Sequence, residues 1–102
     1  MNPYLLMDAQ LDRQAAAKGW VVFKEWANAP ARFFYVSGYD GRDCFQVAIE
    51  PPVMGALVVT ARSVDTTDDQ AFEQVWRGGI DQLDSLLDSA IAQIEIWKSR
   101  AS

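Results

Sequence analysis

The chain contains no histidine and one cysteine, Cys44. Without histidine, the usual Ser-His-Asp and Cys-His arrangements for nucleophilic catalysis cannot form, and the commonest general base near neutral pH is missing. A structural zinc site needs several Cys or His ligands, which one cysteine cannot supply. Asp43 adjoins Cys44, and a reactive thiol needs a basic environment, so we expect a structural cysteine. These residue types predict no enzyme, metal or cofactor.

Carboxylates are the remaining groups that could do chemistry. Asp65, Asp68 and Asp69 cluster in the chain, and oxygen ligands of this kind hold divalent cations. Their spacing matches no calcium-binding loop, and aspartates at the start of a helix are favoured by capping and by the helix dipole. Together with Glu50, they support only an alternative function, that of a carboxylate-based metal-dependent enzyme or small-ligand binder.

Asp81, Asp84 and Asp88 follow the spacing i, i+3 and i+7, which places them on one face of a helix. No lysine or arginine occurs between them, and like charges at this spacing cost a few tenths of a kcal/mol per pair. The pattern fits a solvated helix face, or an acidic stripe presented to a basic partner. We therefore treat the three aspartates as candidate partner-binding residues.

Aromatic side chains are concentrated in two strand-like runs. In the first run, alternation predicts one face made of Trp20, Val22, Lys24 and Trp26, and an opposite face with Val21 and Phe23. In the second run, Phe33 and Tyr35 alternate with Phe34 and Val36. Both faces are apolar, so each must be covered, either by the chain's own helices or by a partner chain. Because Trp and Tyr are enriched at interfaces, the candidate partner-binding aromatics are Trp20, Trp26 and Tyr35.

The first segment predicts a helix over residues 3–18. Asn2 suits the N-cap, Pro3 suits the first helical position, and Gly19 suits the end. Four strands should follow, over residues 20–26, 32–39, 44–50 and 57–64, with breaks at residues 28–30, 40–43 and 51–52. The short connections favour antiparallel neighbours in a meander.

The rest of the chain predicts a second helical region from about residue 67 to residue 97. Thr67 and Gln70 have the spacing of a capping box, and Gly78 and Gly79 mark a kink or break. The apolar stripe consists of Phe72, Val75, Trp76, Ile80, Leu83, Leu87, Ile91, Ile94 and Trp97. The predicted fold class is α+β with the order α-β-β-β-β-α, and one sheet face should carry both helices.

Composition sets limits on partners and on location. The 102 residues suit one domain, and 9 basic against 14 acidic residues give a net charge of −5. Such a chain should repel nucleic acid and anionic membranes, so we expect neither as a partner. No apolar run is long enough to span a bilayer, and residues 1–4 do not resemble a signal peptide, so we expect a cytoplasmic protein.

The order of elements, the size and the acidity resemble those of small bacterial secretion chaperones and of small acidic inhibitors and immunity proteins. The resemblance covers architecture and charge, and it transfers no residue roles. It implies a non-enzymatic acidic module that docks on a larger, basic protein surface. The alternative hypothesis is a homo-oligomeric assembly component, with a homodimer as its simplest form.

Overall fold

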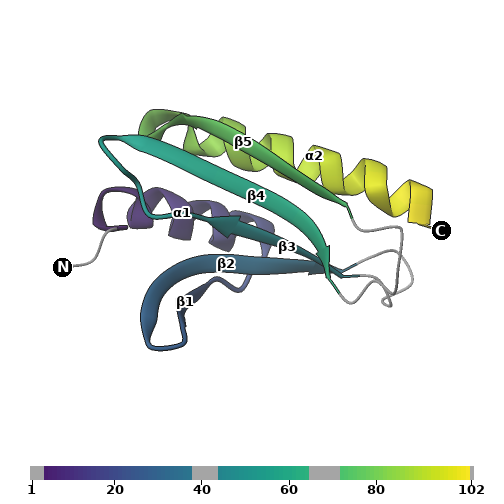
Figure 1. Cartoon of the computed structure of the whole chain (residues 1–102), viewed down its shortest axis with the longest axis horizontal. Helices are drawn as coiled ribbons and strands as arrows, with labels where there is room; N and C mark the ends of the chain where they lie inside the picture. Colours follow the sequence, from purple (N-terminus) through teal and green to yellow (C-terminus); the bar gives the residue numbers. More distant parts are fainter. Residues whose placement is uncertain (1–3, 38–43, 65–71, 102) are drawn as a thin grey trace.

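The structure is a computed structural model that describes residues 4–37, 44–64 and 72–101. It confirms the α+β class, with an N-terminal helix, an antiparallel sheet and a long C-terminal helix (Figure 1). The elements in chain order are α1 (Leu5–Lys18), β1 (Phe23–Trp26), β2 (Ala29–Ser37), β3 (Cys44–Ile49), β4 (Ala56–Val64), β5 (Glu73–Gly79), the 3-10 helix η1 (Ile80–Gln82) and α2 (Leu83–Ala101).

The strands form a meander in the order β1-β2-β3-β4-β5, and every neighbouring pair is antiparallel. The β1–β2 turn consists of Ala27 and Asn28, both at positive φ (52° and 67°), as a tight two-residue hairpin turn requires. The break predicted at residues 28–30 is therefore too long, since β2 already begins at Ala29. The turn predicted at residues 40–43 lies outside the described residues.

Both helices cover the same face of the sheet, as predicted, and lie behind the strands in Figure 1. The strand register places Phe34 beside Val47, and Val47 beside Ala61, so these side chains point toward the helices. The buried core on this face consists of Phe34, Phe45, Val47, Ile49, Leu57, Val59 and Ala61 from the strands, and Tyr4, Met7, Leu11, Leu83, Leu86, Leu87, Ala90, Ile94 and Trp97 from α1, α2 and their ends.

The end of α1 agrees with the sequence. Gly19 adopts a left-handed conformation at φ 76°, and the backbone N–H of Trp20 donates to the carbonyl of Ala15. The predicted start at Asn2 and Pro3 lies outside the described residues. Within the described residues, α1 begins at Leu5. Within the described chain, no helix combines the length and the apolar character that crossing a membrane requires.

The prediction of a helix through residues 73–79 is wrong. This segment is β5, a fifth strand that pairs with β4 from Arg62↔Glu73 to Ala56↔Gly79. An apolar pair such as Val75 and Trp76 suits a strand as well as a helix, and pairing with β4 satisfies backbone groups that β4 would otherwise expose at the sheet edge. The predicted capping residues Thr67 and Gln70 lie outside the described residues.

Gly78 and Gly79 do not bend a helix; they end β5 and lead into η1. A Cβ atom on Gly78 would lie 2.7 Å from Oε1 of Gln82 and 3.3 Å from Cδ1 of Leu86. Glycine therefore allows α2 to fold back closely over the strand that precedes it. The Oε1 of Gln82 also accepts a hydrogen bond from the Gly79 N–H at 2.9 Å, which fixes the junction.

An ion pair between a buried arginine and a half-buried aspartate joins α1 to the β1–β2 hairpin. Arg32 in β2 is only 5% exposed, and its Nε and Nη2 donate to the two carboxylate oxygens of Asp8 in α1 at 2.7 and 2.9 Å. The Nη1 donates to the carbonyl of Lys24 at 3.0 Å, and the guanidinium lies 4.4 Å from the ring centroid of Tyr4. Hydrogen bonding to Asp8 raises the pKa of Arg32 above its ordinary value.

The bond to the Lys24 carbonyl lies at an irregularity between β1 and β2. Phe23 pairs with Phe33, but Glu25 pairs with Pro30, so one residue of β1, Lys24, stands opposite two residues of β2, Ala31 and Arg32. Such a shift disrupts the ladder locally and interrupts the regular alternation of side chains. Trp26 lies on the same face as Phe23, since both rings contact Phe33.

Replacing Asp8 with asparagine should lower the free energy of unfolding by roughly 3 kcal/mol, because a buried guanidinium loses its counter-charge. The matched control is Asp12→Asn one helical turn later, where the carboxylate pairs with Lys24 Nζ at 3.1 Å in an exposed position. This control should cost less than about 1 kcal/mol. Urea denaturation monitored by circular dichroism measures both values. Equal losses in the two variants would contradict the structural role of Arg32.

Candidate functional site

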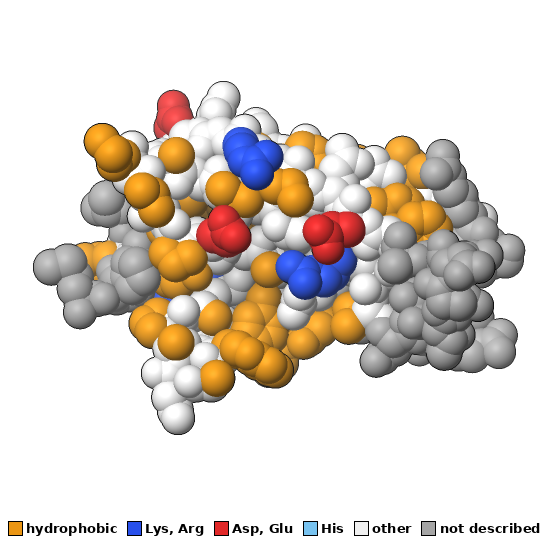
Figure 2. Space-filling view, in the orientation of Figure 1, with side chains coloured by type: hydrophobic (Ala, Val, Ile, Leu, Met, Phe, Trp, Pro, Cys, Tyr) orange, Lys and Arg blue, Asp and Glu red, His pale blue; other side chains and the backbone are white. Residues whose placement is uncertain are grey.

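The candidate site lies on the sheet face that no described helix covers, which we call the open face. Its main feature is an aromatic cluster formed by Phe23, Trp26, Phe33 and Tyr35. Phe33 is 8% exposed, whereas Phe23, Trp26 and Tyr35 are 45%, 68% and 42% exposed. Figure 2 views this face and shows hydrophobic side chains gathered over β1 and β2, with charged side chains over the neighbouring strands.

Ring contacts hold the cluster together around Phe33. Phe23 stacks on Phe33 with centroids 5.2 Å apart, and Trp26 meets Phe33 edge-on at 6.0 Å. Tyr35 makes edge contacts with both Phe23 and Phe33, each at 5.8 Å. Aromatic pairs of this geometry contribute about 0.5–1.5 kcal/mol each beyond buried area, so the exposed rings are held in defined positions.

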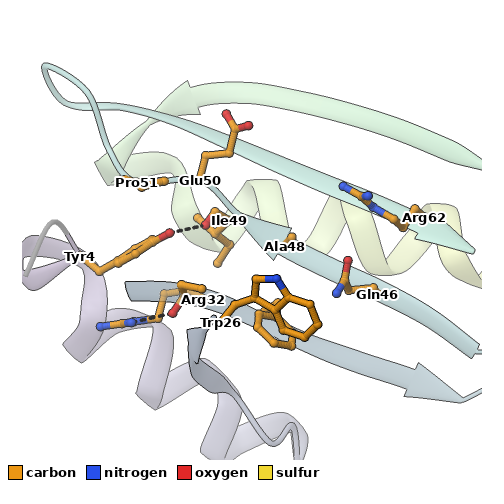
Figure 3. Close-up of a pocket in the computed structure, with 11 residues that line it drawn as sticks. Tyr4, Trp26, Arg32, Gln46, Ala48, Ile49, Glu50, Pro51 and Arg62 are labelled. Atoms are coloured by element: carbon orange, nitrogen blue, oxygen red, sulfur yellow. Dashed lines mark hydrogen bonds between the residues drawn. The ribbon is translucent and has the colours of Figure 1, made fainter. Parts of the chain in front are cut away.

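A shallow pocket of about 400 Å³ adjoins the cluster. In Figure 3, Trp26 stands over its middle, with Tyr4 and Pro51 toward one end and Gln46 and Arg62 toward the other. The pocket is lined by Tyr4, Trp26, Ala31, Arg32, Phe33, Gln46, Ala48, Ile49, Glu50, Pro51 and Arg62.

Two polar groups of the pocket have structural partners. The Tyr4 hydroxyl donates to the carbonyl of Ile49 at 3.0 Å, and Arg32 is bound to Asp8. Burial raises the pKa of the Tyr4 phenol above its ordinary value, although the nearby Arg32 charge acts in the opposite direction. Exposed Glu50 and Arg62 therefore offer the pocket's accessible charges, one of each sign. Such a site can bind an apolar or mixed surface.

The structure brings together two of the three predicted aromatic residues. Trp26 and Tyr35 both belong to the cluster, but the prediction that Trp20 shares a face with Trp26 is wrong. Trp20 precedes β1, is half-buried and stacks on Phe34 at 4.2 Å on the helix-covered side. The physical reason is that Trp20 lies outside β1 and that the β1–β2 register shifts between Phe23 and Glu25, so no single alternation runs from Trp20 to Trp26.

The acidic stripe of Asp81, Asp84 and Asp88 lies elsewhere. Asp81 precedes α2, within η1, so the three residues do not share one continuous α-helix as predicted. Asp81 and Asp88 are exposed, whereas Asp84 is half-buried and its Oδ1 has no hydrogen-bond partner among the described residues. Because α2 packs on the opposite side of the sheet, the stripe and the aromatic cluster do not form one surface.

The other candidate chemistry stays untested. Asp65, Asp68 and Asp69 lie outside the described residues, and so does the side chain of Cys44. Within residues 4–37, 44–64 and 72–101, no three His, Cys, Asp or Glu side chains are placed to hold a metal ion. Sequence reasoning overlooked the contribution of Phe33 as the centre of the cluster, and the pairing of Asp8 with Arg32 could not be read from spacing.

No protein-family model, curated protein or solved structure matches this chain. A functional interpretation therefore depends on the geometry of the open face, on the charge of the chain and on its residue types.

Tyr4→Phe should reduce stability by about 1–2 kcal/mol at neutral pH, because the buried Ile49 carbonyl loses its donor. The pKa of Tyr4 is raised in the folded state. The phenol's contribution to the free energy of unfolding is therefore complete below the unfolded pKa of about 10, and it is lost as the pH rises through the folded pKa. The difference in stability between the native chain and Tyr4→Phe should therefore narrow at alkaline pH. Urea denaturation at several pH values measures it, and a constant or widening difference would contradict this account.

Proposed function

We propose that this chain is a non-enzymatic protein-binding module that docks on a larger protein through the aromatic cluster of its open face. The observation that carries the proposal is the exposure of Phe23, Trp26 and Tyr35 around the buried ring of Phe33. Contiguous exposed apolar patches are uncommon on monomeric proteins and mark interaction sites.

The cluster has the properties of an interface centre. Tryptophan and tyrosine are the residue types that most often dominate binding energy, especially where neighbouring groups exclude water. Trp26 is the most exposed ring of the cluster, and its contact with Phe33 orders it before binding. Pre-ordered side chains lose less conformational entropy on association, so more of the buried area contributes to affinity. A partner with an apolar cavity that accepts Trp26 is the best fit.

The charge of the chain supports a basic partner. The net charge is −5, and Asp81 and Asp88 are exposed on the side of the sheet away from the cluster. Charges outside a contact surface still raise association rates through long-range attraction. We therefore assign docking to the aromatic cluster and steering to the acidic side chains. A module of this kind suits the role of an inhibitor, an immunity protein or a secretion-type chaperone, and a chain with one cysteine suits a reducing compartment such as the cytoplasm.

Trp26→Ala should weaken binding to the partner by at least about tenfold, as expected for a central interface tryptophan. The partner is first isolated with tagged wild-type chain, purified, and then titrated by isothermal calorimetry. Ile96→Ala is the matched control, because Ile96 is a large exposed apolar residue on α2, behind the sheet. It should leave the affinity unchanged. Equal affinities for Trp26→Ala and wild type would refute docking through the cluster.

Replacing Asp81 and Asp88 together with asparagine should slow association and flatten its dependence on salt, while the dissociation rate stays nearly constant. Stopped-flow mixing with the same partner at low and high ionic strength measures both rates. Asp12→Asn is a control with the same change at one exposed carboxylate of α1. An unchanged salt dependence in the double variant would remove the acidic stripe from the proposal.

A further inference from the structure

The far edge of the sheet from the aromatic cluster is β5, and its hydrogen-bonding groups alternate in direction. The N–H of Ser63 donates to the carbonyl of Phe72, and the N–H of Ile80 donates to that of Gly55. Bonded residues alternate along an antiparallel strand, so these two contacts show which residues of β5 bond to β4. They are the even-numbered ones. The backbone groups of Glu73, Val75 and Arg77 consequently point outward, away from the sheet.

These outward groups form a short open edge with Val75 at its centre. The next outward N–H, that of Gly79, already donates to Gln82, so the open segment ends there. No described residue forms a backbone hydrogen bond to the outward side of Glu73, Val75 or Arg77. An edge with unpaired N–H and C=O groups is a template for another strand.

We infer that a second copy of this chain binds here, with two β5 strands pairing antiparallel about a two-fold axis at Val75. In that register Val75 lies opposite Val75 of the other copy. The outward N–H and C=O groups of Glu73, Val75 and Arg77 then lie opposite outward groups of the second β5, as hydrogen bonding between the strands requires. Two five-stranded sheets would join into one continuous sheet. This interface is independent of the aromatic cluster, which lies on β1 and β2 at the opposite edge.

Charge favours one of the registers that hydrogen bonding allows. Glu73, Val75 and Arg77 share the open face of the sheet, so pairing about Val75 places each Glu73 opposite Arg77 of the other copy. The nearest other registers of correct phase are centred on Gln74 or on Trp76, and they place Glu73 or Arg77 opposite Val75. The registers centred on Glu73 or on Arg77 place two like charges directly opposite. Edge charges usually prevent strand pairing, but the register centred on Val75 matches each of them with an opposite charge.

The other face of the joined strands is also compatible with a dimer. Pairing about Val75 places Gln74 opposite Trp76 of the other copy, which would add cover to this half-buried ring. On α2, Leu86 approaches Gly78 of β5, and Ser89 and Gln93 follow it at i+3 and i+7 on the same side of the helix. None of these three side chains is charged.

The acidic side chains of α2 do not oppose such a dimer. Asp84 and Asp88 are each two positions from Leu86, so they lie about half a turn around the helix axis from it. Dimerisation would leave both acidic stripes and both aromatic clusters exposed. The product would be a bivalent module, which can bind multivalent partners more tightly than one copy does.

Charge exchange between copies tests the inference. Wild type should be a dimer at micromolar concentration by analytical ultracentrifugation. Glu73→Arg and Arg77→Glu should each self-associate about tenfold or more weakly, because like charges then stand opposite. An equimolar mixture of the two variants should form a heterodimer, and the double variant E73R/R77E should recover self-association. The mixture and the double variant both contain the altered charges. Recovered association would therefore show that the single variants had lost strand pairing and not their fold.

Val75→Pro provides a second test. It removes one outward N–H at an edge position where proline is tolerated, so the chain should fold and remain monomeric. Trp26→Ala should still dimerise, which separates this interface from the proposed docking surface. A wild-type monomer, or a dimer that the charge exchanges do not affect, would overturn the inference. Pairing of β5 only with an extended segment of a different protein would overturn it as well.

Discussion

The guanidinium of Arg32 is the group on which the arrangement of the open face depends. It binds both oxygens of Asp8 and the carbonyl of Lys24, so one buried group connects α1, β2 and β1 at the shift in their register. A buried charge without these partners would be costly, which means that the hairpin and the helix can dock only in the arrangement that satisfies them. Beyond this register shift, Trp26 lies beside Phe33 on the open face.

A sheet with both helices on one side has two unequal faces. The covered face supplies a single core, while the open face carries an aromatic cluster beside a pocket with one accessible charge of each sign, Glu50 and Arg62. Conversely, Asp81 and Asp88 are exposed on the helical side. The fold thus places Asp81 and Asp88 on the other side of the sheet from the aromatic cluster. Charges in that position would keep their hydration if the cluster were covered.

The fifth strand shows how tertiary context decides an ambiguous segment. The sequence around Val75 and Trp76 carries apolar residues at spacings that suit a helix, and the glycines after them disfavour helix continuation. Once β4 is in the sheet, its free edge offers the segment a full ladder of hydrogen bonds. Because β5 pairs with β4, the open edge of the sheet is β5 instead of β4. Glu73 and Arg77 lie at equal distances along β5 on either side of Val75.

The sequence by itself determined the α+β class, the end of α1 at Gly19, the three central strands with their alternation, and the apolar stripe of α2. These are local features, governed by capping chemistry and by periods of two and 3.6 residues. Only the tertiary structure decided the register shift between β1 and β2, the separation of Trp20 from the face of Trp26, the pairing of Arg32 with Asp8 and the identity of β5. Each of these depends on contacts between segments distant in the chain, which no local pattern encodes.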